Sequence, residues 1–227
     1  MKKTVFLMAS LFLGVTIAAR EVTSAELLRT EPDSILRMYQ LMKDVHELFF
    51  LHNIKYWAAG GTLLGAVRHQ GIIPWDVDLD IFIDQDDEKK LLNLSTFFSN
   101  LNYVLFKKRE YVYKLYPKEY PKDHIDIILT YQEDNKIFYS CKNLQKAYRR
   151  DGLPLYFTNE ELYPLRLSKF GLFNVVIANN PHPYLFYAYG SNYLTHAHDS
   201  ILQKVLLLEA DRVPAQPMGP LKNRVQS

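Results

Sequence analysis

The chain has a single cysteine, Cys141, among its 227 residues. An intrachain disulfide is therefore excluded. The lack of cysteine pairs also argues against a zinc site at His196, His198 and Asp199, because structural zinc needs four ligands. The sequence has no internal repeat, no low-complexity tract and no long basic run, and its formal net charge is only +2. We therefore expect no nucleic-acid partner held by bulk charge.

The N-terminus lacks a hydrophobic run long enough to cross a membrane comfortably. Residues 4–19 carry no charge and follow two lysines. As a helix they would be roughly 24 Å long, against about 30 Å of bilayer hydrocarbon. We expect a signal peptide over residues 1–25, which would send the protein into the secretory pathway, secreted or periplasmic. The alternative is an uncleaved anchor through residues 4–19 and membrane association through it.

The rest of the chain is long enough for one domain, with a hydrophobic content of 48% that is ample for a core. We expect this domain over residues 26–210 and a disordered tail over residues 211–227. Hydrophobic spacing predicts helices over residues 33–52, 62–67, 86–100 and 201–209. It predicts strands over residues 56–59, 76–83, 103–108, 111–116, 124–129, 135–139, 165–170 and 173–176.

Three aspartates alternate with apolar residues near the middle of the first half. Asp76, Asp78 and Asp80 are separated by Val77 and Leu79, and alternation of period two is typical of a strand. On a strand the carboxylates share one face, about 6–7 Å from one to the next. A divalent cation turns their repulsion into attraction, and Mg²⁺ favours one or two carboxylates together with substrate phosphates. The alternative is an edge strand that carries acids for solubility.

Two glycines precede this triplet and follow an apolar run over residues 56–59. Gly60 and Gly61 supply a turn, and Thr62 is a good N-cap for the helix that continues through Val67. A strand, a glycine turn and a helix start leave free N–H groups at the positive end of a helix dipole, where phosphate binds. Plain turn chemistry is the alternative.

A later apolar run, residues 124–129, has one acid in its middle, Asp126. A buried carboxylate without a partner is costly, so Asp126 should lie beside a cation or a hydrogen-bond donor. Asp123, at the rim of the strand, is its rival, and a side chain that faces solvent is the other alternative. Residues 142–150 are rich in basic side chains, which indicates either a solvated face or an anion contact for a phosphorylated substrate.

These motifs together resemble the signature of the LicD family. The resemblance rests on residues 60–69, Gly-Gly-Thr-Leu-Leu-Gly-Ala-Val-Arg-His, followed by Ile73-Pro74-Trp75-Asp76 and Asp78-Leu79-Asp80. The family includes bacterial phosphorylcholine transferases and the fukutin-related proteins, inside the nucleotidyltransferase-fold superfamily. Its third acid, on a later strand between apolar neighbours, corresponds to Asp126. Residues 181–190 resemble the family's C-terminal helix, so the resemblance covers about residues 50–195.

The resemblance implies an α/β (α+β) fold, a nucleotidyltransferase-like mixed β-sheet flanked by helices. It implies transfer of a phospho-alcohol, phosphocholine or a similar group, from a CDP-activated donor. The acceptor would be a hydroxyl of a glycan or glycoconjugate such as lipopolysaccharide. Mg²⁺ would be the cofactor, or Mn²⁺ in its place.

The same resemblance assigns roles to individual residues. The metal ligands, which are also the expected catalytic residues, would be Asp78, Asp80 and Asp126. The expected substrate-binding residues are Gly60, Gly61, Thr62 and Arg68. Asp126 would help to remove the acceptor's proton, and Arg68 would neutralise a donor oxygen unless it is a surface residue. Val77 stands where many members have another acid, so a second metal would be held less firmly.

Two other functions stay open at this point. The same acids would serve a nucleotidyltransferase that moves a nucleoside monophosphate onto an acceptor. A secreted, non-catalytic relative is the other alternative, because activated nucleotides are scarce outside the cytosol. Product analysis with CDP-choline against nucleoside triphosphates separates the two enzymatic functions.

Overall fold

The computed structural model describes residue 23, residues 27–199 and residues 203–206. Apart from residue 23, the expected leader over residues 1–25 lies outside the described residues, and so does the expected tail over residues 211–227. Both stay predictions. Within the described part of the chain, no helix has the length and apolar character that a membrane span requires.

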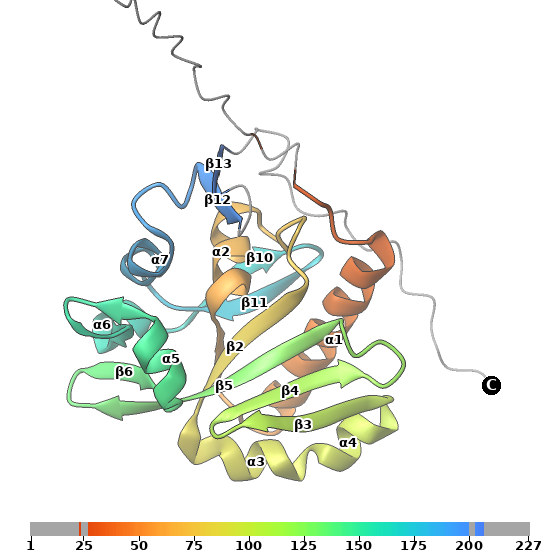
Figure 1. The fold of residues 1–227 in the computed structure, drawn as a ribbon. Coiled ribbons are helices and arrows are strands. Elements are labelled where there is room, and N and C mark those ends of the chain that lie inside the picture. The colour runs from red at the N-terminus through yellow and green to blue at the C-terminus, as the bar shows by residue number, and fades with distance from the viewer. Residues whose placement is uncertain (1–22, 24–26, 200–202, 207–227) are drawn as a thin grey trace, which may run out of the picture.

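A seven-stranded mixed sheet forms the centre of the fold (Figure 1). Its main path is β1-β2-β5-β4-β3, and β6 and β9 extend it beside β5. The pair β2 and β5 is parallel, and the other neighbours are antiparallel. The strands are β1 (Tyr56–Ala58), β2 (Asp78–Asp84), β3 (Tyr103–Arg109), β4 (Val112–Pro117), β5 (His124–Glu133), β6 (Lys136–Tyr139) and β9 (Tyr156–Thr158). The expected mixed sheet flanked by helices is confirmed, and β2 is an interior strand rather than an edge.

Alternation along β2 and β5 gives the sheet one apolar face. Leu79 pairs with Ile125 and Ile81 with Ile127, and all four side chains are almost completely buried. Helix α1 (Pro32–Leu51) packs on this face and contacts β2, β4 and β5. Its buried side chains are Ile35, Met38, Tyr39, Leu41, Met42, Val45 and Phe49. Each such side chain contributes roughly 1.5–3 kcal/mol by leaving water, so the core holds β2 and β5 in fixed register.

The other helices and hairpins surround the sheet. Figure 1 shows α3 and α4 beside β3, and α5 and α6 beside β6. The helices are α2 (Gly60–Arg68), α3 (Glu88–Asn93), α4 (Ser95–Asn100), α5 (Lys142–Ala147), α6 (Asn159–Leu162) and α7 (His182–Tyr189), with a 3₁₀ turn η2 (Gln85–Asp87). The hairpins are β7 (Arg149–Arg150) with β8 (Leu153–Pro154), β10 (Arg166–Phe170) with β11 (Phe173–Ile177), and β12 (His196–Asp199) with β13 (Gln203–Leu206).

Two predicted helices differ from the structure. The helix expected over residues 86–100 is divided at Leu94, whose N–H bonds the carbonyl of Leu91, three residues back rather than four. Asparagine, serine and threonine surround this point, and all three are weak helix formers. The helix expected over residues 201–209 is wrong for residues 203–206, which pair with β12 as a strand. Pairing with a distant segment overrides local preference there.

Candidate active site

Strands β2 and β5 bring four polar side chains together on one face of the sheet. Asp80 lies directly opposite Asp126, and Asp78 lies opposite His124. Paired residues of neighbouring strands project to the same side, and so do residues two apart along one strand. The structure thus places Asp78, Asp80 and Asp126 together as the sequence predicted, while their chemical roles stay predictions.

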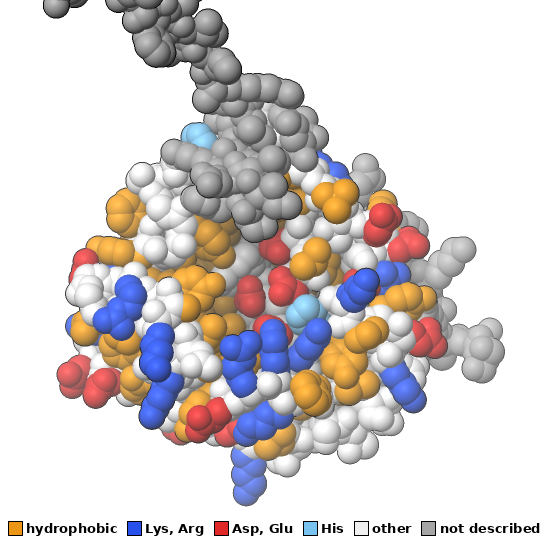
Figure 2. Space-filling model, viewed as in Figure 1, with side chains coloured by type: hydrophobic (Ala, Val, Ile, Leu, Met, Phe, Trp, Pro, Cys, Tyr) orange, Lys and Arg blue, Asp and Glu red, His pale blue; other side chains and the backbone are white. Residues whose placement is uncertain are grey.

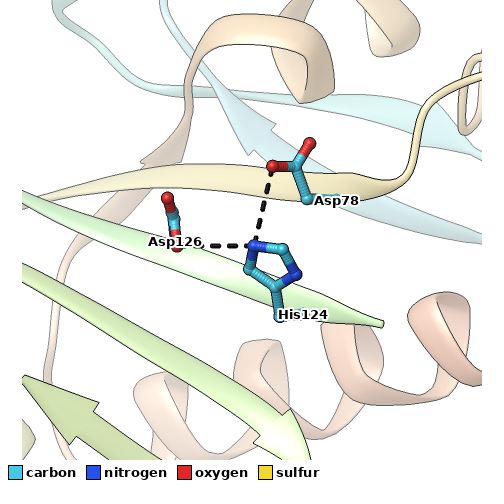
Figure 3. Close-up of side chains that lie close together, drawn as sticks. All are labelled: Asp78, His124 and Asp126. Atoms are coloured by element: carbon cyan, nitrogen blue, oxygen red, sulfur yellow. Dashed lines mark ion pairs between the residues drawn. The ribbon is translucent and has the colours of Figure 1, made fainter. Parts of the chain in front are cut away.

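Three of these side chains converge on one point (Figure 3). One ligand atom from each of Asp78, His124 and Asp126 lies within 4.8 Å of the others. His124 Nε2 is 3.6 Å from Asp78 Oδ2 and 3.6 Å from Asp126 Oδ1. Carboxylate oxygens and an imidazole nitrogen are donors that divalent first-row cations accept. The cluster therefore has the composition of a metal centre.

One oxygen of Asp126 needs a further partner. Among the described residues, Oδ1 is buried and has no hydrogen-bond partner. Oδ2 forms an ion pair with Lys108 Nζ at 2.6 Å. A buried carboxylate oxygen without a donor or cation is costly. A metal ion bound beside Asp78 and His124 would give this oxygen its missing partner, so the residues present fit a metal ion.

The glycine turn packs directly against Asp80 of β2 and against Asp76, which lies just before that strand. A Cβ atom on Gly60 would lie 2.4 Å from Asp80 Oδ2, and one on Gly61 would lie 2.4 Å from Asp76 Oδ2. Gly60 also has a φ of +44°, in the left-handed region that favours glycine. Neither position has room for a side chain, so the turn and the acids form one compact unit.

The polar groups of this turn already have partners within the chain. The N–H of Gly61 hydrogen-bonds the Asp80 carboxylate, and the N–H of Gly60 bonds the Tyr184 hydroxyl. Thr62 Oγ1 accepts from the N–H of Asp80 at 2.7 Å. The expectation that Thr62 caps the helix is therefore wrong, because α2 begins at Gly60 and the threonine oxygen binds β2 instead. The contact of this turn with donor phosphate stays a prediction.

Burial and mutual repulsion raise the pKa of all three aspartates around β2. Burial, followed by the Asp78 carboxylate, raises the pKa of Asp76 to about 7. Burial also raises the pKa of Asp78, although His124 opposes the shift. Burial and the carboxylates of Asp78, Asp76 and Asp126 raise the pKa of Asp80 well above its ordinary value. Acids perturbed in this way cluster at functional sites, and a bound cation would relieve the repulsion.

Arg68 has a structural contact that the sequence did not reveal. Its Nη1 donates to the carbonyl of Tyr193 at 2.7 Å and to that of His196 at 3.0 Å. The side chain is buried, so it is not the surface residue that was the alternative. It ties the end of α2 to the segment after α7. Its contact with a donor oxygen stays a prediction.

Asp123, the rival of Asp126, lies in a different contact. Its carboxylate accepts from Ser34 Oγ at 2.7 Å and pairs with the guanidinium of Arg37. Both partners belong to α1, so Asp123 links that helix to the start of β5. Asp126 is the acid that joins the cluster.

Lys108 and His124 are the two members of the site that sequence reasoning missed. Lys108 reaches Asp126 because the register of β3 against β4 shifts between Lys107 and Arg109. Such a β-bulge re-aims a side chain, and no clear sequence signal marks it. His124 could have been found, because it precedes Asp126 by two residues on the same strand and must share its face.

A cleft with a volume of about 200 Å³ opens beside the carboxylates. Asp80, Asp126, Gly60 and Arg109 contribute to its lining, and its aromatic members are Phe82, Tyr139, Tyr148, Tyr184 and Tyr189. The hydroxyls of Tyr139 and Tyr184 lie 2.7 Å apart, and the ring of Phe157 stacks on Tyr184 with centroids 4.4 Å apart. These contacts hold the aromatic wall in place before any ligand binds.

The acids are accessible in a hollow of the surface (Figure 2). In this view red carboxylates lie at the centre of the hollow beside a pale-blue histidine, and blue Lys and Arg side chains crowd its lower rim. Positive charge around a pocket attracts anionic ligands and raises their local concentration. The surface thus combines a cluster of acids with a rim suited to phosphate groups.

A glycine turn beside acids from two adjacent strands of a mixed sheet defines a domain of nucleotidyltransferase type. Comparison with known families agrees: the family described as LicD/FKTN/FKRP, nucleotidyltransferase domain, matches residues 53–180. The matched stretch contains the glycine turn, Lys108 and all four side chains of the cluster. The chain belongs to the LicD family.

Several known proteins are similar to this chain in sequence. Uncharacterized protein RP689 of Rickettsia prowazekii is 39% identical over 203 residues, which cover 84% of this chain and 73% of the relative. Lipopolysaccharide cholinephosphotransferase LicD of Haemophilus influenzae is 41% identical over 49 residues, 22% of this chain and 18% of that protein. Human ribitol 5-phosphate transferase FKRP is 56% identical over 34 residues, 15% of this chain and 7% of that protein. The two named transferases thus match over short segments of their own length.

Among solved structures, the lincosamide adenylyltransferase LnuA with bound lincomycin has 14% identity and a TM-score of 0.44. The match covers 77% of this chain and 92% of that one.

Proposed function

We propose that this domain transfers a phospho-alcohol from a CDP-activated donor onto a hydroxyl of a glycan or glycoconjugate, with Mg²⁺ as cofactor. The observation that carries the proposal is the group of acids Asp78, Asp80 and Asp126 on two paired strands beside a cleft, where Asp78 and Asp126 converge with His124. Phosphoryl-type transfer asks little covalent chemistry of a protein, and positioning and charge neutralisation dominate. The acids on β2 and β5 could hold a cation that neutralises the phosphate charge, and the buried Oδ1 of Asp126 has no hydrogen-bond partner among the described residues.

The relatives support the transfer of a phosphorylated alcohol. One is named for moving cholinephosphate onto lipopolysaccharide and the other for moving ribitol 5-phosphate. Choline and ribitol differ in charge and shape, so the pair supports the class of group and leaves the particular alcohol open. The matches are short, and the carry-over to this chain is part of the proposal.

The cleft favours a donor whose ring or small headgroup packs on aromatic side chains. Pockets that bury a drug-sized ligand measure roughly 300–1,000 Å³. At about 200 Å³, this cleft suits one part of a donor rather than the whole molecule. Aromatic rings stack on a nucleobase and also attract a quaternary ammonium group. The diphosphate would then lie over Asp80 and Asp126, toward the basic rim.

The chain's own residues have separate tasks in the proposed reaction. Asp78, Asp80 and Asp126 would hold the cation, which supplies charge neutralisation at the donor's diphosphate when bound. The acceptor oxygen forms a bond to the phosphorus that carries the alcohol, and the bond from that phosphorus to the oxygen of CMP breaks. Asp126 takes the acceptor's proton, and Lys108, whose Nζ lies 2.6 Å from that carboxylate, would offset the negative charge of the departing CMP.

Incubation of the full chain with Mg²⁺ and a panel of CDP-alcohols tests the proposal. CDP-choline and CDP-ribitol are offered with candidate glycans, and CMP release is followed together with the mass of the glycan. We expect CMP release that EDTA abolishes and a glycan mass increased by one phospho-alcohol.

Two other outcomes would overturn it. Pyrophosphate release from a nucleoside triphosphate, with a nucleotide added to the acceptor, would establish the nucleotidyltransferase alternative. The absence of turnover with every donor, although Mg²⁺ and nucleotide bind, would establish a non-catalytic relative. The secretory leader and the anchor alternative are tested separately, by the N-terminal sequence of the mature protein.

A further inference from the structure

We propose that His124 is a metal ligand in addition to Asp78, Asp80 and Asp126, and that its nitrogen biases the centre toward Mn²⁺ over Mg²⁺. The inference rests on the metal site of the proposed function and goes beyond it. The family resemblance supplies the three acids, whereas the histidine follows from the geometry of this chain.

The position of His124 follows from strand pairing. It lies opposite Asp78 and two residues before Asp126, so β2 and β5 present these side chains at adjacent points of one face. Its side chain is 12% exposed and is directed at the two carboxylates (Figure 3). The rigid sheet, rather than a flexible loop, therefore holds the imidazole in the cluster.

A backbone contact fixes the proton of the imidazole. His124 Nδ1 lies 2.6 Å from the carbonyl oxygen of Lys122. A carbonyl only accepts hydrogen bonds, so Nδ1 carries a proton and donates it. In the neutral ring Nε2 then has a free lone pair, and this is the atom that points at Asp78 and Asp126. Metal-binding histidines commonly donate their other N–H to a backbone carbonyl in this way.

The distances around Nε2 fit ligation better than hydrogen bonding. Nε2 is 3.6 Å from one oxygen of Asp78 and 3.6 Å from Oδ1 of Asp126. Hydrogen bonds of this kind are about 2.7–3.2 Å long, so neither oxygen is bonded to the ring. Two atoms that bind one ion at about 2.1 Å each can lie up to about 4.2 Å apart. Oδ1 is also the buried oxygen that has no hydrogen-bond partner among the described residues.

Ligand chemistry gives the direction of the metal preference. Mg²⁺ is a hard cation that takes oxygen ligands and retains its waters. Mn²⁺ also favours carboxylates, but it belongs to the first-row series that binds mixed nitrogen and oxygen sites, in which it is the weakest member. An all-carboxylate site would favour either ion through charge alone. A nitrogen in the set adds affinity for Mn²⁺ that Mg²⁺ gains only weakly.

Mn²⁺ bound to the full chain provides a direct test. Electron spin echo measurements report a ¹⁴N nucleus bound to Mn²⁺, independently of any turnover. We expect ¹⁴N modulation in the wild-type chain and its loss in His124→Asn, whose amide oxygen can still ligate. Titration calorimetry should show Mn²⁺ affinity falling roughly ten- to a hundredfold in this variant, with Mg²⁺ affinity changed less than about threefold. His52→Asn, the same change at the end of α1 and outside the cluster, should leave both affinities and the ¹⁴N modulation unchanged.

The outcomes separate this inference from the proposed function. Wild-type Mn²⁺ bound without ¹⁴N modulation would overturn the role of His124 and identify it as a charged partner of the carboxylates, whether or not the chain is active. An equal loss of affinity for both ions in His124→Asn would also overturn the preference for Mn²⁺. Clear ¹⁴N modulation in a chain that releases no CMP would support the ligand and contradict only the transferase. The melting temperature of each variant confirms that it is folded.

Discussion

The mutual repulsion of Asp76, Asp78 and Asp80 is only partly offset by cationic side chains of the fold, namely His124, Lys108 and Arg68. Lys108 pairs with Asp126, and no other Lys or Arg among the described residues forms an ion pair with this group of acids. The pKa of each of these three acids is raised, with burial as the main cause. At the residue scale, the site is therefore expected to gain stability when an acid is neutralised and to lose function at the same time.

Asp78→Asn tests this opposition. The amide keeps the shape of the side chain and removes one negative charge, so the melting temperature in EDTA should equal or exceed that of the wild type. CMP release in Mg²⁺ should fall at least about 100-fold, because a metal ligand is lost. Asp134→Asn, the same change in the exposed β5–β6 turn, is the matched control and should leave both quantities unchanged. Full turnover in Asp78→Asn would contradict the metal-ligand role.

The raised pKa of Asp76 predicts how stability depends on pH. Its pKa is about 7 in the folded chain and about 4 in the unfolded chain, so the folded state binds this proton more tightly. The resulting stability is fully present below about pH 4 and is lost as the pH rises past 7. In EDTA, the melting temperature should therefore fall by at least about 3 °C between pH 5.5 and pH 7.5.

Mg²⁺ should oppose this loss, because a cation binds the deprotonated acids. Its stabilising effect should be larger at about pH 7.5 than at about pH 5.5. Burial lowers the pKa of His46, which adds a pH dependence of the opposite sign. Asp76→Asn isolates the carboxylate, since only its own share of the slope disappears. Scanning calorimetry of the two chains measures both effects, and equal slopes would exclude Asp76 as their source.

At the scale of secondary-structure elements, the site depends on the close approach of the glycine turn at the start of α2 to strand β2. A Cβ on Gly60 would lie 2.4 Å from Asp80 Oδ2, and its φ is +44°. Gly152 also has a positive φ, +78°, but a Cβ there meets nothing within 4 Å. An alanine would be strained by the positive φ at either position, but only at position 60 would its Cβ collide with an acid of the site.

Gly60→Ala and Gly152→Ala therefore form a matched pair. Strain alone should cost Gly152→Ala about 1 kcal/mol of unfolding free energy and leave Mg²⁺ affinity unchanged. Gly60→Ala should lose more stability and at least about tenfold in Mg²⁺ affinity, because the new methyl group must displace Asp80. Denaturant unfolding and calorimetric titration measure the two quantities. Equal behaviour of the two variants would mean that the turn does not position the acid.

The elements also show which features the sequence could specify. Period-two alternation was sufficient to place Asp78 and Asp80 on one face. Asp126 was singled out by the resemblance to the family's third acid, because the residues alone left Asp123 and a solvent-facing side chain as alternatives. Alternation could not show that Asp80 and Asp126 lie opposite one another, because register between strands depends on contacts far apart in sequence. The bulge that directs Lys108 into the site was hidden for a related reason, since it depends on how β3 pairs with β4. Thr62 was misjudged because its hydroxyl binds the Asp80 N–H, a tertiary contact that competes with capping.

At the scale of the whole molecule, Arg68 connects the site to the last described segments. It lies at the end of the helix whose first residue contacts Asp80, and it hydrogen-bonds carbonyls more than a hundred residues later. Its positive charge also lowers the pKa of Asp76 in part. The sequence predicted a different role, contact with a donor oxygen. The two roles predict different effects of one substitution.

Arg68→Met separates them. Loss of the buried charge-assisted hydrogen bonds leaves the carbonyls of Tyr193 and His196 without this donor, which should cost about 2–4 kcal/mol. For a chain of this size that corresponds to a fall of about 5–15 °C in melting temperature. Arg109→Met is the matched control, because Arg109 lines the cleft from an exposed position on β3. It should raise the KM for the CDP donor at unchanged melting temperature. If Arg68→Met instead raised KM and melted like the wild type, its guanidinium would belong to the donor site, and the hydrogen bonds to the C-terminal segment would contribute little to stability.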